Sequence, residues 1–332
     1  MKQFFQQIFF LLLLCLVTIP NAWAAQTEER ILKFPADVCY GQLIVLERGD
    51  HDLSKGGIDI PALQSRLGAA QGVVCLKLQP SVAICLDPNY KLYKNPAALK
   101  LFPAQGIDSV RVRFIAQDDA ELIYCDRLLS YLGHLQSLTK IKLNNSDVSD
   151  KGLASIGPLP HLRDLQAGAT SLTGRSLPVL AKYPALEEVA LSRVNLSGAK
   201  ISDLSPLKHL ETLNLHGTRI GNGELKDIGK ISSLKFLKLD GNAKLDDRCL
   251  ADFHSLKALK ELDITGTNIT AAGVAAHLKG LPLHKLFLNA SHSTSANVAR
   301  LAKALPKCKL VFPQNKNSKP GELVEQLFAP LH

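Results

Sequence analysis

Aromatic residues are scarce in this sequence, which has a single Trp and a single Met among its 332 residues. Only 6% of the residues are Phe, Trp or Tyr, although 46% are hydrophobic. The chain can therefore bury a large core, but the core must consist mainly of Leu, Ile, Val and Ala. Such uniform cores are common in proteins that stack one small structural unit many times.

The sequence also lacks the short motifs of common enzymes and metal sites. It contains no Cys-x-x-Cys, no His-x-x-x-His, no Gly-x-Ser-x-Gly elbow, no Walker loop and no dinucleotide fingerprint. Four histidines recur at similar intervals and would be either a metal ladder or exposed loop residues: His134, His161, His209 and His284. The missing His-x-x-x-His spacing favours loops, so we predict no catalytic site, no metal site and no cofactor.

The formal net charge is +9, with 39 basic and 30 acidic residues interspersed along the chain. A basic balance suits polyanionic partners such as anionic lipid headgroups or acidic glycans, but it also suits ordinary solubility. The interspersed acidic residues favour ordinary solubility.

Residues 1–24 have the pattern of a cleaved signal peptide. Lys2 supplies the positive start, an apolar run extends from Ile8 to Ile19, and Ala22-Trp23-Ala24 is a small-x-small cleavage signal. A membrane anchor is the alternative, but the run is shorter than the roughly 20 residues needed to span a bilayer. Lipidation at Cys15 would need smaller residues before it. We therefore predict export to the periplasm or the outside of the cell, no membrane span and no nucleic-acid partner.

Removal of residues 1–24 leaves six cysteines: Cys39, Cys75, Cys85, Cys125, Cys249 and Cys308. An even number in an oxidising compartment permits up to three disulfides, which would staple the N-terminal part of the chain. The cysteines could equally be buried free thiols that act as small apolar residues. The sequence does not decide between the two.

A repeated phrase decides the fold class. Leucines recur at intervals of 24 residues, with one interval of 25, and each opens a Leu-x-x-Leu-x-Leu phrase with aliphatic variation. The openings are Leu138, Leu162, Leu186, Leu210, Leu234, Leu259 and Leu283. Alternating apolar residues predict a short strand with one buried face, and the aliphatics that follow at helical spacing predict a short helix. One unit cannot cover its own apolar face, so the units must stack.

After most phrases comes a small residue, usually Ser or Thr, which is expected to hydrogen-bond nearby backbone as the chain leaves the strand. Examples are Ser146, Thr170, Thr218 and Thr267. The extra residue in the longer repeat is expected in a bulge near Asn242-Ala243-Lys244. These features resemble the leucine-rich-repeat family, in its secreted bacterial variety with a Thr-x-Ile-x-Asp-x-Gly-Leu-like continuation. The resemblance implies an α/β solenoid, with a curved parallel sheet on its concave side and short helices on its convex side.

Weaker phrases occur earlier, around Leu43, Leu76 and Val110, at spacings of 31 to 34 residues. We interpret them as longer, irregular repeats, although a separate small α/β domain is possible. The expected organisation is a signal peptide (1–24), an N-terminal cap with irregular repeats (25–104), the solenoid (105–312) and a C-terminal tail with a short helix (313–332). Residues 309–312 are expected to form a last strand.

In this family, strand residues between the buried leucines point into the concave surface, so the phrase predicts a binding face residue by residue. The predicted face is basic at its start and mixed afterwards, with two late aromatics. Its residues are Lys77, Arg111, Arg113, Lys140, Lys142, Asn144, Asp164, Glu188, Asn214, His216, Phe236, Lys238, Asp240, Glu261, Asp263, Lys285 and Phe287.

The sequence thus predicts a non-catalytic protein that recognises a protein partner through this face. The alternative is a binder of an anionic glycan or cell-envelope polymer, through a basic patch of Lys77, Arg111, Arg113, Lys140 and Lys142. The fold alone does not decide between them, because one scaffold serves many recognition tasks.

Overall fold

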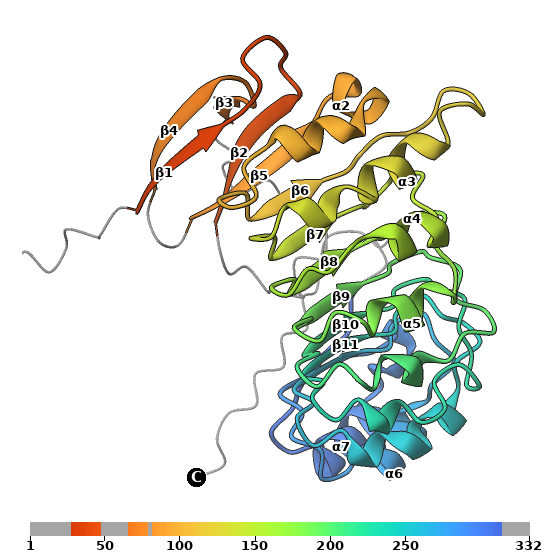
Figure 1. Ribbon diagram of the computed structural model, residues 1–332. Helices are drawn as coiled ribbons and strands as arrows, with labels where there is room; N and C mark the ends of the chain where they lie inside the picture. Colours follow the sequence, from red (N-terminus) through yellow and green to blue (C-terminus); the bar gives the residue numbers. More distant parts are fainter. Residues whose placement is uncertain (1–27, 48–65, 79–81, 314–332) are drawn as a thin grey trace, which may run out of the picture. The chain divides into compact units, whose positions relative to one another are not determined.

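The computed structural model describes residues 28–47, 66–78 and 82–313 (Figure 1). These residues divide into two compact units. Unit 1 contains the described residues up to Arg111 together with His134–Leu138. Unit 2 contains Val112–Gly133 and the described residues from Thr139 onward. Strand Ser109–Arg111, which the sequence assigns to the solenoid, therefore belongs to unit 1. The predicted signal peptide and nearly all of the predicted tail lie outside the described residues.

Unit 1 is built mainly from antiparallel strands. Strand β1 (Glu28–Lys33) pairs antiparallel with β4 (Val73–Leu78). Strand β2 (Gly41–Glu47) lies between β3 (Arg66–Ala69) and β5 (Val82–Pro88) and is antiparallel to both. A short helix α2 (Tyr90–Lys94) and a 3-10 segment η2 (Pro96–Leu101) then lead to β6 (Ser109–Arg111), which is parallel to β5.

The prediction that the phrases around Leu43 and Leu76 are irregular repeats is wrong. Leu43 lies on β2 and Leu76 on β4, and both strands pair antiparallel with their neighbours. A stacked repeat must place each strand parallel to the one before it, through a crossover connection. The alternative, a small unit with its own strand pairing, is the one that the structure supports.

Unit 2 contains eight short parallel strands in sequence order. They are β7 (Lys140–Lys142), β8 (Asp164–Gln166), β9 (Glu188–Ala190), β10 (Thr212–Asn214), β11 (Phe236–Lys238), β12 (Glu261–Asp263), β13 (Lys285–Phe287) and β14 (Lys309–Val311). Each strand pairs in register with the next, so equivalent positions of successive repeats lie side by side. The parallel sheet with short helices confirms the predicted α/β solenoid class, and β14 forms at the predicted last strand.

Short helical segments connect the strands and contact one another in series (Figure 1). The α-helices are α3 (Ile123–Leu129), α4 (Asp150–Ser155), α5 (Ser176–Leu180), α6 (Ala271–His277) and α7 (Ser295–Ala304). The 3-10 segments are η3 (Leu132–His134), η4 (Ile201–Leu204), η5 (Ile228–Lys230), η6 (Asp247–Ser255) and η7 (Ala290–His292). Most span only one or two turns, which leaves little room for helix between strands about 24 residues apart.

The core of unit 2 is a column of aliphatic side chains between the sheet and the helical segments. The central residue of each strand from β7 to β13 is completely buried: Ile141, Leu165, Val189, Leu213, Leu237, Leu262 and Leu286. The leucine that opens each phrase is also buried, as with Leu186 and Leu210. Each fully buried aliphatic side chain contributes about 1.5–3 kcal/mol of hydrophobic free energy. Stability therefore accumulates layer by layer.

The predicted turn hydrogen bonds are present. The hydroxyls of Ser146 and Thr218 donate to the carbonyl three residues earlier, at 2.6 and 2.8 Å. Thr170 and Thr267 do the same. In the longer repeat, the buried Asn242 amide replaces the hydroxyl and donates to the Leu239 and Leu215 carbonyls, both at 2.8 Å. The extra residue thus lies in the turn after β11, without disturbing strand register.

Aspartates at the starts of helical segments tie successive repeats together. Asp126 accepts hydrogen bonds from the backbone N–H (2.9 Å) and hydroxyl (2.5 Å) of Ser149, the N-cap of α4. Asp150 binds Thr173 in the same way, one repeat later. Gly152 follows Ser149 in the first turn, and a Cβ at this glycine would lie 1.9 Å from an Asp126 carboxylate oxygen. Only glycine leaves space there for the aspartate of the preceding repeat.

This close approach predicts that Gly152→Ala destabilises unit 2. Overpacking of a filled site costs about 1–3 kcal/mol, and here it also displaces a carboxylate that caps a helix. Gly223→Ala is the matched control, because a Cβ there meets nothing within 4 Å. Urea unfolding monitored by circular dichroism compares the two variants. Equal unfolding free energies would show that Gly152 is not needed for the contact with Asp126.

Candidate interaction surface

The side chains that flank the buried central residue of each strand in unit 2 point to the opposite side of the sheet, away from the aliphatic column. We call this surface the strand face, and it consists of two rows in strand register. The first row is Lys140, Asp164, Glu188, Thr212, Phe236, Glu261, Lys285 and Lys309. The second row is Lys142, Gln166, Ala190, Asn214, Lys238, Asp263, Phe287 and Val311.

The structure brings most of the predicted face residues together on these rows. Three more lie just beyond the carboxyl ends of their strands: Asn144, His216 and Asp240. Asn144 contributes to the backbone structure, since its side-chain oxygen accepts a hydrogen bond of 2.6 Å from the Gly168 N–H. His216 and Asp240 pair with each other across adjacent repeats.

Three predicted residues lie elsewhere. The placement predicted for Lys77 is wrong, because Lys77 lies opposite Glu29 in the antiparallel pair of β1 and β4. Arg111 is buried on β6 in unit 1. Arg113 is exposed but follows β6 in a segment without strand structure. The predicted basic patch is therefore divided between the two units, since Arg113, Lys140 and Lys142 belong to unit 2.

Charged side chains at the start of the strand face are packed against one another. Asp164 is only 7% exposed and Lys142 only 6%. The Lys140 ammonium forms an ion pair with one Asp164 oxygen, to which the Gln166 amide also donates at 3.3 Å. Burial raises the pKa of Asp164 to about 6, the Glu188 charge adds to the increase, and both lysines oppose it. These charges compensate one another and are not freely solvated.

Two further acidic groups surround the histidine of the strand face. The Asp240 carboxylate lies 2.6 Å from His216 Nδ1, and this hydrogen bond raises the pKa of His216. Burial raises the pKa of Asp263 in the next repeat, and the neighbouring Asp240 charge adds to the effect. The Asp263 carboxylate also accepts hydrogen bonds from the backbone and hydroxyl of Thr265. This part of the face changes charge in the mildly acidic range.

The two aromatics of the strand face are half-buried. Phe236 lies between Thr212 and Glu261 in the first row. The ring of Phe287 has the Lys285 ammonium 4.8 Å from its centroid, which is within range for a cation–π interaction. Partly exposed aromatics in a polar surround are favoured anchors in protein interfaces.

The predicted residues omitted the last layer of the strand face. Lys309 and Val311 on β14 continue the two rows beside Lys285 and Phe287. The alternation Lys309-Leu310-Val311 was the signal that could have identified them, since it repeats the pattern of the earlier strands.

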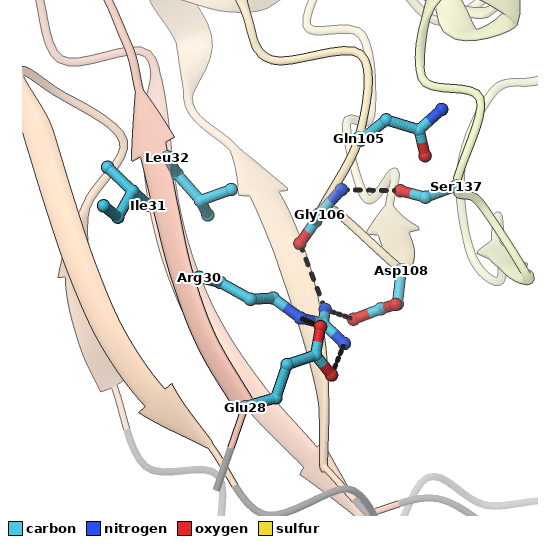
Figure 2. A pocket seen from close by; sticks show the side chains of 8 residues that line it. All are labelled: Glu28, Arg30, Ile31, Leu32, Gln105, Gly106, Asp108 and Ser137. Atoms are coloured by element: carbon cyan, nitrogen blue, oxygen red, sulfur yellow. Dashed lines mark hydrogen bonds and ion pairs between the residues drawn. The ribbon is translucent and has the colours of Figure 1, made fainter.

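Unit 1 contains a cleft of about 370 Å³ around Arg30 (Figure 2). The Arg30 guanidinium donates to the Asp108 carboxylate (2.5 Å), to the Gly106 carbonyl (3.3 Å) and to Glu28 (3.0 Å). Asp108 is buried and also accepts a hydrogen bond from the Ile84 N–H. Burial of Arg30 acts to lower its pKa, but the hydrogen bonds to Glu28 and Asp108 outweigh this and raise it. The cluster joins β1 to the segment before β6 and is structural.

The six cysteines are all free thiols. Cys85, Cys125, Cys249 and Cys308 are buried, and burial raises the pKa of Cys125, Cys249 and Cys308 to about 12. They therefore pack as small apolar residues, which was one of the two alternatives from the sequence.

In the described part of the chain, no three His, Cys, Asp or Glu side chains are grouped as a metal site would require. Nor is any helix among these residues long and apolar enough to cross a membrane. Of the four recurring histidines, His161, His209 and His284 are exposed, whereas His134 contacts the Phe102 carbonyl at 2.9 Å.

Two stretches of the chain, residues 134–157 and 256–276, match a family model described as leucine rich repeat. They coincide with the repeats that contain β7 and β12. The Thr-x-Ile-x-Asp-x-Gly-Leu-like variety stays a prediction. No curated protein matches the chain.

Similar solved structures include two internalins from Listeria monocytogenes strain 4b F2365. Internalin C2 is 18% identical over 65% of this chain and 84% of its own, with a TM-score of 0.43. The internalin inlF is 19% identical over 66% and 64%, with a TM-score of 0.45. The TLR13 chain of a TLR13–ssRNA13 complex is 20% identical over 62% and 32%, with a TM-score of 0.41.

The contact between His216 and Asp240 predicts a pH-dependent contribution to stability. The pKa of folded His216 lies above the unfolded value of about 6.5, so the contribution is complete below that value and is lost as pH rises through the folded pKa. NMR titration of the His216 ring measures the folded pKa. Asp240→Asn should lower it, and a ring pKa of 6.5 or less in the unaltered protein would contradict the prediction.

The Arg30 cluster predicts that Arg30→Met destabilises unit 1, because it takes the guanidinium partner from a buried carboxylate. Loss of one partner of a buried ion pair costs about 3–5 kcal/mol. Glu28→Gln is the control, since the Glu28 side chain is 56% exposed and a surface pair is worth about 0–1 kcal/mol. Denaturant unfolding, followed by hydrogen exchange of β1 and β5 amides, would refute the prediction if the two variants were equally stable.

Proposed function

We propose, on the premise that this chain is built from leucine-rich repeats, that it is an exported, non-catalytic protein that recognises a protein partner through its strand face. Export rests on the signal-peptide pattern of residues 1–24, and the expected location is the periplasm or the cell exterior. No cofactor and no nucleic acid take part in this proposal.

One observation supports the strand face above other surfaces. Between repeats the buried central strand residues barely change, whereas the side chains that flank them change from Lys to Asp, Glu, Thr and Phe along a single row. A stack needs the aliphatic column, but it does not need this variety on the other side of the sheet. Extended sheet surfaces of repeat proteins are commonly used for binding.

The composition of the face favours a protein over a polymer of one charge. Acidic and basic side chains alternate along the rows, and Phe236 and Phe287 supply half-buried aromatic surface. A basic patch for an anionic glycan is less well supported. Arg111 and Lys142 are buried, and Lys140 is paired with Asp164.

The proposal predicts that Phe236→Ala combined with Phe287→Ala abolishes partner capture. Residues 25–332 are immobilised, and proteins retained from envelope and secreted fractions are identified by mass spectrometry at low and high salt. Aromatic anchors of an interface contribute about 2 kcal/mol or more each, so the pair should weaken retention by roughly 30-fold or more.

The matched control is Leu122→Ala with Ile123→Ala, two exposed aliphatics of unit 2 outside the strand face. A partner whose retention survives high salt, falls with the Phe variants and is unaffected in the control supports the proposal. Retention that is equal in both double variants would place binding on another surface. Retention of acidic polymer alone, lost at high salt, would favour the glycan alternative.

A further inference from the structure

The first row of the strand face has a charge order that indicates what kind of segment it would bind. Two neighbouring positions near its start are acidic, Asp164 and Glu188. The two positions at its end are basic, Lys285 and Lys309. Phe236 lies between these pairs, two strands from Glu188 and two from Lys285.

The acidic pair has unmet capacity for a cation. Asp164 and Glu188 lie side by side in register, and like charges in that arrangement repel each other. Lys140 and Gln166 bind only one Asp164 oxygen, and the other, Oδ1, is buried with no hydrogen-bond partner in the described residues. A guanidinium or ammonium group placed on this pair would offset both the repulsion and the missing hydrogen bond.

The basic pair has the opposite character. Lys285 and Lys309 are side by side in register, and only Glu261 lies next to them in the same row. Lys285 is half-exposed and held over the Phe287 ring, whereas Lys309 is exposed. A carboxylate from a partner would meet two ammonium groups here and one carboxylate.

We propose that the partner presents an extended segment that crosses the strands, with a basic side chain on the Asp164–Glu188 pair, an apolar one on Phe236 and an acidic one on the Lys285–Lys309 pair. This inference rests on the proposed function and names the chemistry of its partner. Complementary charge at both ends fixes the position of the segment, and the phenyl ring between them provides apolar contact.

The strand spacing sets the spacing of the motif. Neighbouring strands are about 4.8 Å apart, so Glu188 and Phe236 are separated by roughly 10 Å, as are Phe236 and Lys285. An extended chain advances about 3.3–3.6 Å per residue, so three residues cover each interval. The expected segment is therefore basic-x-x-apolar-x-x-acidic, or the same order reversed, because the strand face contacts its side chains in either chain direction.

Three fluorescent nine-residue peptides with a Ser and Gly background test the motif against residues 25–332. The bipolar peptide has Arg, Leu and Glu three residues apart. The other two replace Glu by Arg or Arg by Glu, so that both charges have one sign. Fluorescence polarisation should show that the bipolar peptide binds about 10-fold more tightly than either of the others, which is the effect of one lost charge contact.

Charge reversal in the protein should reverse the preference. Glu188→Lys should favour the all-acidic peptide, and Lys285→Glu should favour the all-basic one. Lys226→Glu is the matched control, because Lys226 is exposed outside the strand face, and it should leave the order of affinities unchanged. A merely structural role for Glu188 or Lys285 would weaken binding of all three peptides without changing their order.

Several outcomes would overturn the inference. Equal affinities of the three peptides, or no binding of any, would show that the strand face does not recognise a bipolar segment. If Phe236→Ala then weakened all three equally, the proposed function would survive without this motif. Binding that is unaffected by Phe236→Ala, Glu188→Lys and Lys285→Glu would count against both.

Discussion

The register of the aliphatic column is the constraint on which the rest of unit 2 depends. The central residue of each strand is buried against the same residue of the next repeat, from Ile141 through Leu213 to Leu286. A slip by one residue would move these side chains to the opposite side and bury the charged ones. The hydrophobic free energy of the column therefore fixes the positions of Lys140, Asp164 and every other strand-face residue, although none of them contributes to it.

The same register makes the strand face a crowded surface. Since strands in a sheet are only about 4.8 Å apart, side chains of one row contact those of the next repeat. This explains why Lys142, Asp164 and Lys238 are nearly covered although they point away from the core. Charges held in this way have few rotamers left to lose when a partner binds, which lowers the entropic cost of recognition.

The parts of this structure that the sequence predicts are those where one local pattern repeats. The 24-residue phrase placed β7 to β13 in register and located the extra residue after β11. It failed around Leu43 and Leu76, because an apolar alternation predicts a strand but not the direction of the strand that pairs with it. The irregular spacing of those phrases was the available warning.

The candidate surface was predicted in outline rather than in detail. The alternation rule identified Glu188, Phe236 and Phe287 as strand-face residues, but burial of Asp164 and Lys142 depends on neighbours in other repeats. Similarly, the contact between His216 and Asp240 joins residues 24 positions apart, and neither has a local signal for it. Lys77 was misplaced because its position was derived from a repeat that does not exist.

Chemical footprinting of the protein with and without its captured partner tests the central claim most directly. Hydroxyl radicals label aromatic side chains, and a carbodiimide with an amine labels exposed carboxylates. The account predicts that the partner reduces labelling of Phe236, Phe287, Glu188 and Glu261, whereas Tyr90 in unit 1 and Asp203 on η4 keep theirs. Unchanged labelling of the strand face, with protection of Tyr90 or Asp203 instead, would contradict it.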